Sequence, residues 1–157
     1  MADDISTIGF VSADAHVNEP RDLWSSNLPA GLREHAMRGI AAGDDGNWGV
    51  LFDSAAVDMT SRVEDERLLV NDPAHRRAVM RAEGIVAEAV FPTIGLYVWS
   101  LTDPDGGAAS CRVYNEWIAD ALGGRPRFAC AGLVPTWRVE DARREIDRDR
   151  AHLGAQR

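Results

Sequence analysis

The chain has 157 residues, enough to form one domain with a hydrophobic core, and its 45% hydrophobic and 27% charged residues are ordinary for a globular protein. The formal net charge of -8 disfavours binding to the backbone of a nucleic acid, and no basic stripe offsets it. All 17 basic residues are arginine, which excludes a Schiff-base lysine or a carbamylated lysine bridging two metals within this chain.

The sequence shows neither a signal peptide nor a membrane span. It starts with the acidic segment Met1-Ala2-Asp3-Asp4, and no long apolar run follows. We therefore expect a cytoplasmic protein without a membrane partner. Cys111 and Cys130 are too far apart for a redox or zinc-ribbon pair, so we expect both to behave as small, partly buried apolar residues.

The first expected element is a strand over about residues 8–13, and it ends in Asp14-Ala15-His16. In an extended strand residues i and i+2 point to the same side, so the side chains of Asp14 and His16 can converge on one point. Carboxylate and imidazole are both zinc ligands, and parallel α/β proteins place their chemistry at the carboxyl ends of strands. Aspartate and histidine are also common turn residues after a strand, so the pair alone leaves a purely structural interpretation open.

A long region without clear periodicity follows, over residues 17–71. It contains several glycines and few regularly spaced apolar residues, which predicts an irregular insertion. A connection of this length inside a compact domain usually covers a functional site or is poorly ordered.

The rest of the chain alternates between helix and strand patterns. Asp72-Pro73 is a typical helix start, with Ala74, Ala78 and Ala82 on one face and Gly84 at the stop. A second strand is expected over 85–91, ended by Pro92-Thr93, and a loop over 102–107 leads into the next helix. That helix has one apolar face, formed by Tyr114, Trp117, Ile118, Ala121 and Leu122.

Gly123-Gly124 ends this helix, and a third strand is expected over 128–134, closed by Pro135-Thr136. The last helix has apolar residues at helical spacing, namely Val139, Ala142, Ile146 and Leu153. Three strand–helix repeats with apolar strands indicate a parallel α/β fold. The repeated Pro-Thr after a strand favours βα units of a barrel, with three strands in sequence order and helices on one side. A flavodoxin-like open sheet is the competing topology.

The motifs in this order resemble the metal-dependent amidohydrolase superfamily, in the branch of aminocarboxymuconate semialdehyde decarboxylase. The segments that carry the resemblance are Asp14-Ala15-His16, Asn18-Glu19-Pro20-Arg21-Asp22-Leu23-Trp24, residues 84–93, residues 112–117, and Arg127-Phe128 onward to Pro135. The resemblance implies the N-terminal three βα units of a TIM-type (β/α)8 barrel. Such a barrel needs eight units and typically about 250 residues. The chain is therefore expected to be a fragment, a truncated product or one half of a split enzyme.

By resemblance, Asp14 and His16 hold a divalent metal, with zinc favoured and manganese as the alternative. A further histidine ligand and a catalytic aspartate are implied on later strands, so no catalytic residue is assigned within this chain. The implied activity is hydrolysis or non-oxidative decarboxylation of a small carbonyl or carboxylate substrate. His35, His75 and His152 are interpreted as surface histidines.

Other residues have smaller expected roles. Glu19 is expected either to orient His16 or a loop, or to be only a turn residue before Pro20. Trp24 either caps the site or anchors the long loop. Pocket lining or simple packing is expected for the residues that follow the second strand, namely Phe91, Thr93, Tyr97 and Trp99. Glu88 is a charge within an apolar strand, which is costly unless it is paired, so we expect it to meet an arginine in the barrel interior or to face solvent.

The alternative to an enzyme is an inactive remnant or an interaction module. Its open sheet edges would pair with another copy or with a separate C-terminal half. In either case, we expect the isolated chain to lack metal-dependent turnover and to be marginally stable or self-associating.

Overall fold

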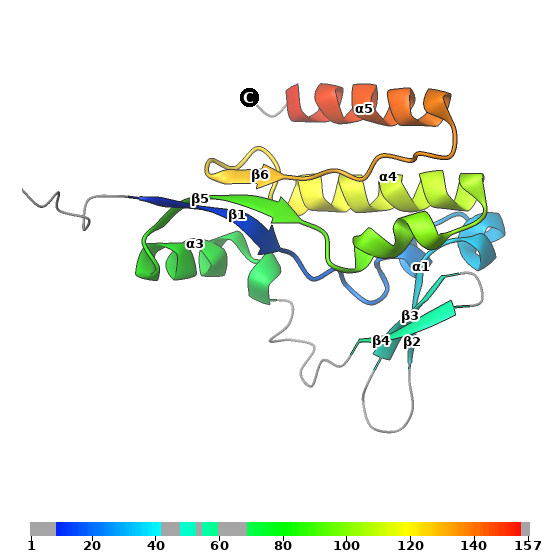
Figure 1. Ribbon diagram of the computed structural model, residues 1–157, viewed down its shortest axis with the longest axis horizontal. Helices are drawn as coiled ribbons and strands as arrows, with labels where there is room; N and C mark the ends of the chain where they lie inside the picture. Colours follow the sequence, from blue (N-terminus) through cyan, green and yellow to red (C-terminus); the bar gives the residue numbers. More distant parts are fainter. Residues whose placement is uncertain (1–8, 42–47, 53–54, 60–68, 155–157) are drawn as a thin grey trace, which may run out of the picture.

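A three-stranded parallel sheet organises the chain (Figure 1). The computed structural model describes residues 9–41, 48–52, 55–59 and 69–154. Strands β1 (Phe10–His16), β5 (Ile85–Phe91) and β6 (Phe128–Cys130) lie side by side in this order and run parallel. The predicted parallel α/β architecture, with its strands in sequence order, is confirmed.

Helices accompany the strands of this sheet, namely α3 (Pro73–Ala82), α4 (Pro104–Ala121) and α5 (Val139–Gly154). Side-chain contacts place α3 and α4 on the same face of the sheet. Arg76 of α3 binds Glu88 of β5, and Val90, two residues further along that face, is buried with residues of α4. In the part of the chain that the structure describes, no helix is both long and apolar enough to cross a bilayer.

The start of α3 follows the predicted capping pattern. The Asp72 carboxylate accepts hydrogen bonds from the backbone N–H groups of Ala74 (3.1 Å) and His75 (2.9 Å), and Pro73 occupies the first helical position. These bonds lower the pKa of the Asp72 carboxyl, and the hydrogen bond from the His75 N–H has the largest effect. Gly84 after the helix has a φ of 71°, the left-handed conformation that glycine adopts without strain.

Helix α4 starts earlier than predicted, because Asp103 and Pro104 repeat the same capping arrangement. The Asp103 carboxylate accepts a hydrogen bond from Gly106 N at 2.7 Å. The loop predicted over 102–107 is therefore wrong from residue 104 onward. Gly106 allows a close approach here, because a Cβ at this position would lie 2.1 Å from the backbone oxygen of His35.

The region 17–71 is less irregular than predicted. It contains the elements α1 (Leu23–Asn27), η2 (Ala30–His35), β2 (Arg38–Ala41), β3 (Trp48–Phe52), β4 (Ala55–Met59) and η3 (Leu69–Asn71). Strands β2, β3 and β4 form an antiparallel sheet in this order. These strands are short and two of them contain glycine, so they show no clear alternation of apolar residues.

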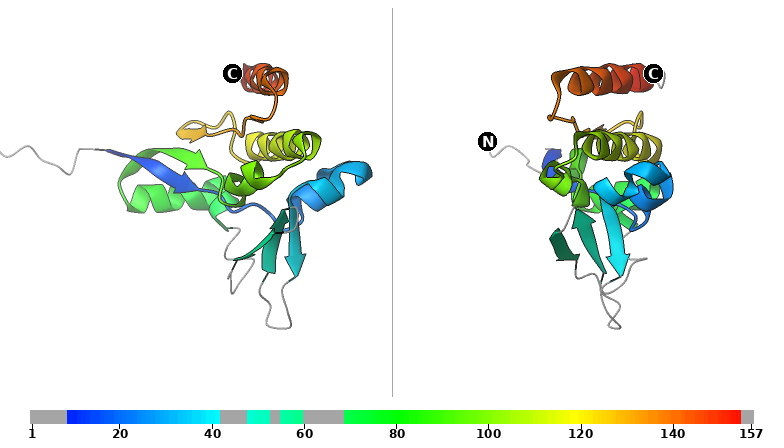
Figure 2. Two further views of the ribbon diagram at one scale, coloured as in Figure 1. Left: turned by 45° about the vertical axis from the view of Figure 1, so that its right-hand side comes forward. Right: turned by 90° about the vertical axis from the view of Figure 1, so that its right-hand side faces the viewer.

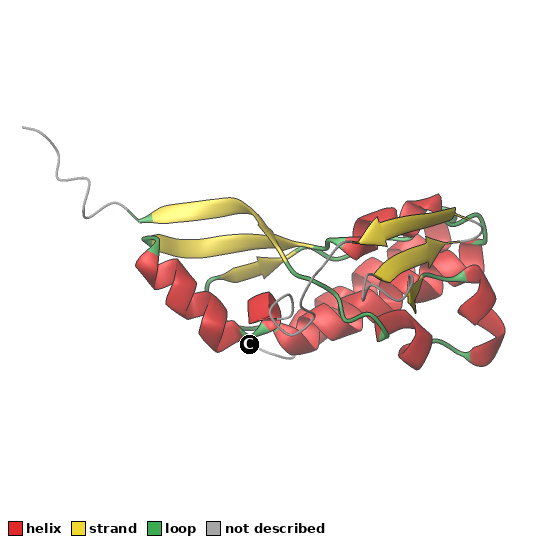
Figure 3. Cartoon of the chain, turned by 90° about the horizontal axis from the view of Figure 1, so that it is seen from below, coloured by secondary structure: helices red, strands yellow, loops and turns green. Residues whose placement is uncertain are grey.

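The two sheets lie toward opposite ends of the long axis of the molecule (Figure 3). The antiparallel sheet and α5 lie on opposite sides of the molecule (Figure 2). The two ends of the inserted region are joined by paired hydrogen bonds. Asn18 N donates to Asn71 Oδ1 at 3.0 Å, and Asn71 Nδ2 donates to Asn18 O at 2.6 Å.

Strand β6 is shorter than the predicted 128–134. Ala131 N still donates to Val90 O at 2.8 Å, but a side chain then takes over the backbone hydrogen bonds of the segment. Asn115 of α4 donates to Leu133 O at 2.9 Å and accepts from Leu133 N at 2.7 Å. The segment is therefore held by a helix side chain in place of a neighbouring strand.

The core forms between the sheet, α4 and the N-terminal part of the insertion. Its largest members include Trp24, Met37, Ile94, Tyr114, Leu122 and Leu133. Tyr114, Ile118 and Leu122 are buried, in agreement with the apolar face predicted for α4.

In two helices the regularly spaced apolar residues do not form the packed face. Ala74, Ala78 and Ala82 of α3 are exposed, because the buried side of this helix carries Arg76 and Met80.

In α5, Val139 and Ile146 are exposed, while Glu145 is buried. The Glu145 carboxylate accepts a hydrogen bond from Asn115 Nδ2, so a polar contact sets which side of α5 faces α4. Apolar spacing alone did not identify the packed face of either helix.

Candidate metal site

The structure brings Asp14 and His16 together at the carboxyl end of β1. The strand extends through His16, three residues beyond the predicted end, and His16 pairs with Phe91 at the end of β5. The two side chains converge, with His16 Nε2 at 3.2 Å from Asp14 Oδ1. This geometry is the one that the two-residue spacing predicts for an extended segment.

The hydrogen bond at the other ring nitrogen of His16 determines which nitrogen carries the proton. His16 Nδ1 lies 2.8 Å from the backbone oxygen of Pro92. A carbonyl oxygen can only accept, so Nδ1 carries the proton and, in the neutral ring, Nε2 keeps its lone pair. The lone pair of Nε2 and a carboxylate oxygen then face each other, which suits a shared cation. A protonated ring would instead form an ion pair with Asp14.

The pair is accessible from solvent, since the His16 side chain is 40% exposed and that of Asp14 is 91% exposed. Among the described residues, no cluster of three or more His, Cys, Asp or Glu side chains could hold a metal ion. The described residues therefore bring together one pair of candidate ligands, whereas a zinc site takes four ligands. Metal-binding histidines commonly donate their other N–H to a carbonyl or carboxylate, as His16 does here.

Phe91 and Thr93 flank the His16 ring. The Phe91 ring is tilted by 42° to the imidazole, with a distance of 6.2 Å between ring centroids. Thr93 Oγ1 donates to Val17 O at 2.6 Å and lies 3.4 Å from His16 Nδ1. Both residues therefore lie beside the candidate ligand.

The Glu19 carboxylate binds the turn after β5. This buried carboxylate accepts hydrogen bonds from the N–H groups of Thr93 (3.2 Å), Ile94 (2.9 Å) and Gly95 (2.8 Å), at the start of η4 (Ile94–Ser100). Burial raises the pKa of the Glu19 carboxyl, and these bonds act in the opposite direction. Glu19 thus holds the turn that contains the Pro92 carbonyl.

Trp24 is placed in the interior. It is 1% exposed, and its indole N–H donates to the backbone oxygen of Ser110 in α4 at 3.1 Å. Of the two roles expected for Trp24, these contacts match the anchoring of the inserted region.

Other residues singled out in the sequence do not join the pair. His35 and His75 are exposed, as interpreted from the sequence, while the side chain of His152 lies outside the described residues. Trp99 is 45% exposed and donates to Val134 O at 3.3 Å.

The arginine partner expected for Glu88 is Arg76 of α3, a residue that the sequence did not single out. Its guanidinium is buried and pairs with Glu88, with 2.6 Å between Arg76 Nε and Glu88 Oε2. Arg76 also donates through Nη2 to the backbone oxygen of His16 at 3.0 Å. The isolated charge at Glu88 was the available signal, because a charge on a buried strand requires a partner nearby.

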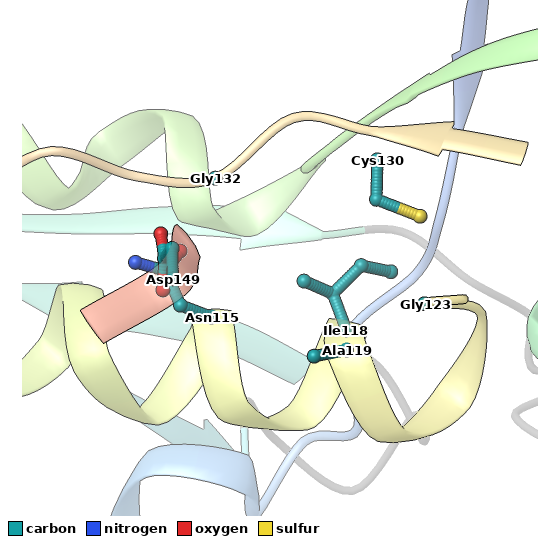
Figure 4. Close-up of a pocket in the computed structure, with 7 residues that line it drawn as sticks. All are labelled: Asn115, Ile118, Ala119, Gly123, Cys130, Gly132 and Asp149. Carbon is teal, nitrogen blue, oxygen red and sulfur yellow. The ribbon is translucent and has the colours of Figure 1, made fainter. Parts of the chain in front are cut away.

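A cavity lies between α4, α5 and the segment after β6 (Figure 4), and it shares no residue with the Asp14–His16 pair. It is lined by Asn115, Ile118, Ala119, Gly123, Cys130, Gly132 and Asp149. Burial raises the pKa of the Cys130 thiol to about 11, so at neutral pH it is a protonated thiol and a poor nucleophile. Cys111 is also unpaired, as expected.

Comparison with protein-family models and with curated proteins found no match. The solved structures that share the fold include the following two. An amidohydrolase from Mycobacterium avium subsp. paratuberculosis K-10 has a TM-score of 0.78 at 17% identity, over 93% of this chain and 47% of its own. The 2,6-dihydroxybenzoate decarboxylase from Rhizobium has a TM-score of 0.52 at 20% identity, over 93% of this chain and 36% of its own.

The chain therefore spans less than half of the length of either structure. The likeness confirms the fold implied by the resemblance to the amidohydrolase superfamily, a partial α/β barrel that contains its first three strands.

Proposed function

We propose that this chain is the N-terminal portion of a metal-dependent enzyme of the amidohydrolase superfamily. The enzyme would hydrolyse or non-oxidatively decarboxylate a small carbonyl or carboxylate substrate. The observation that carries the proposal is the approach of His16 Nε2 to Asp14 Oδ1 at 3.2 Å, while His16 Nδ1 is bound to the Pro92 carbonyl. The partial barrel, shared with an amidohydrolase and a decarboxylase, supports it.

Asp14 and His16 would hold the metal, with zinc favoured for a donor set of imidazole and carboxylate and manganese as the alternative. A metal at such a site lowers the pKa of bound water to about 7 and polarises an oxygen of the substrate. The remaining ligands and the general base would come from strands beyond the three described here.

The other residues near the pair would orient His16. The Pro92 carbonyl holds the Nδ1 proton, and Thr93 ties the β5 end to Val17 through its hydroxyl. Glu19 keeps the turn after β5 in place through the N–H groups of residues 93–95. Phe91 would form part of the wall beside the metal, as its ring lies against that of His16.

A second candidate is an interaction module or inactive remnant that pairs with another copy or with a separate C-terminal half. The exposure of Phe10 (59%) and Val11 (65%) on β1 favours this candidate, because β1 is an edge strand of the sheet. The two candidates differ in whether Asp14 and His16 bind a metal.

Titration of the full chain with Mn²⁺, followed by paramagnetic broadening of backbone amide NMR signals, tests the proposal. We expect broadening centred on residues 14–16 and 91–93, and its loss in His16→Ala. The matched control is His35→Ala, which removes an exposed histidine of η2 and should leave the broadening unchanged. Broadening elsewhere, or its persistence in His16→Ala, would contradict the proposed site.

Turnover is the second arm of this test. With zinc or manganese added, we expect the chain alone to be inactive toward ester, lactone, amide and aromatic-acid substrates. Activity that appears on mixing with a chain that supplies the later strands would favour a split enzyme. Release of carbon dioxide would then separate decarboxylation from hydrolysis.

A further inference from the structure

The Arg76 guanidinium connects α3 to the strand end that carries His16. Arg76 Nε donates to Glu88 Oε2 at 2.6 Å, Nη1 donates to the backbone oxygen of Val70, and Nη2 donates to the backbone oxygen of His16 at 3.0 Å. The side chains of Arg76 and Glu88 are only 7% and 9% exposed. One rigid, planar group therefore holds three partners from separate parts of the chain.

The bond to His16 acts on the residue whose ring faces Asp14. The position of a backbone carbonyl is tied to the direction of the Cα–Cβ bond of the same residue, and hence to the position of the imidazole. The β1–β5 ladder is irregular between Ser12 and Ala15, immediately before His16. The ladder resumes at Ala15 and His16, and Arg76 supplies a further contact to this strand end just beyond the irregularity.

Glu88 directs the guanidinium. It lies on β5 and faces α3, where its carboxylate binds Nε and leaves both terminal nitrogens for backbone oxygens. A pair that only attached α3 to the sheet would not need the third contact, at the end of a different strand.

We propose that Arg76, directed by Glu88, is a positioning residue for the metal site at Asp14 and His16. This inference rests on the proposed function, since it concerns the affinity of that site for a divalent cation. Arg76 touches neither the metal nor a substrate. It acts through the backbone of His16, as partners outside the ligand shell commonly do.

The test separates positioning from stability by replacing the pair in two ways. The double variant Arg76→Met/Glu88→Met removes both buried charges together, which often leaves folding stability near that of the parent protein. It also removes the donor to His16 O. Glu88→Gln is the matched control. The glutamine oxygen can still accept from Arg76 Nε, so the guanidinium keeps its direction and its bond to His16 while the ion pair is lost.

The readouts are urea unfolding and the Mn²⁺ concentration at half-maximal NMR broadening, both measured on the full chain. We expect the double variant to bind Mn²⁺ about tenfold more weakly or worse at near-parental stability. Glu88→Gln should bind within about twofold of the parent, even if it is less stable. Parental affinity in the folded double variant would overturn the inference, as would a loss in Glu88→Gln as large as in the double variant.

Arg76→Lys covers the case in which the double variant does not fold. A lysine keeps the charge opposite Glu88 but cannot span all three acceptors. We expect about tenfold weaker Mn²⁺ binding, and parental binding would overturn the inference. His16→Ala is measured alongside. If it binds Mn²⁺ as the parent does, the proposed function fails and the inference falls with it, whereas failure of the inference alone leaves the His16→Ala effect intact.

Discussion

At the scale of single residues, Glu19 shows how a buried carboxylate can shape the candidate site from a distance. It holds the N–H groups of residues 93–95, and the adjacent Pro92 carbonyl binds the His16 ring. We expect Glu19→Ala to lower the free energy of unfolding by at least about 2 kcal/mol, because buried N–H groups lose their acceptor. Urea unfolding measures this change.

Glu83→Ala is the control for Glu19→Ala. Glu83 is exposed immediately after the last residue of α3, and its substitution should change stability by less than about 0.5 kcal/mol. Equal effects of the two substitutions would show that the Glu19 cap contributes little to folding.

The convergence of Asp14 and His16 follows from their two-residue spacing, so it could be predicted from the sequence. The partners of His16 could not, because Pro92 and Arg76 are 76 and 60 residues away along the chain. The direct partners of Glu19 could not be predicted from the sequence either. The sequence suggested that Glu19 orients His16 or a loop, or forms a local turn, but it did not identify the loop, which is the backbone after β5.

At the scale of elements, the cap of α3 should make folding stability depend on pH. The N–H groups of His75 and Ala74 lower the pKa of the Asp72 carboxyl below 3.8. The ionised cap therefore stabilises the folded chain above that pH, and its contribution falls as the pH drops through the lowered pKa. We expect Asp72→Ala to lower the midpoint of thermal unfolding at pH 7.

The difference in midpoint between Asp72→Ala and the parent should shrink below about pH 3.8. Thermal unfolding at several pH values gives this comparison. A difference that stays constant from pH 7 to pH 3 would show that the charge of Asp72 has no part in the cap.

Asn115 should determine the path of the chain after β6. Its amide binds both backbone groups of Leu133, and Asn115→Leu would leave these buried groups without partners. We expect a loss of about 2 kcal/mol in the free energy of unfolding and faster amide hydrogen exchange at Leu133. Unchanged exchange at Leu133 would mean that the segment is held by other contacts.

Elements with strong local signals could be predicted, as the bounds of β5 and the start of α3 show. Elements that depend on distant side chains could not. The third strand stops at Cys130 because an asparagine from α4 takes over its hydrogen bonds, and α5 turns Glu145 inward because of the same asparagine. The short strands of the insertion lacked the alternation that identifies a strand.

At the scale of the whole molecule, the partial barrel leaves apolar surface exposed. Phe10 and Val11 lie on β1, whose outer edge has no neighbour among the described strands. We expect the chain to self-associate with rising concentration, and Val11→Lys to reduce this because a charged edge strand disfavours pairing. Size-exclusion chromatography with light scattering measures the change.

Val79→Lys is the control for Val11→Lys, since Val79 is similarly exposed but lies on α3. It should leave the self-association unchanged. A chain that stays monomeric at high concentration, or two variants with equal effects, would contradict a role for the β1 edge.

The metal site at Asp14 and His16 is tested most directly by diffraction from zinc-soaked crystals at the zinc absorption edge. We expect an anomalous peak about 2.0–2.2 Å from both His16 Nε2 and an Asp14 carboxylate oxygen, with His16 Nδ1 still bound to the Pro92 carbonyl. Zinc bound elsewhere, while the direct contact between His16 and Asp14 persists, would contradict the proposed site.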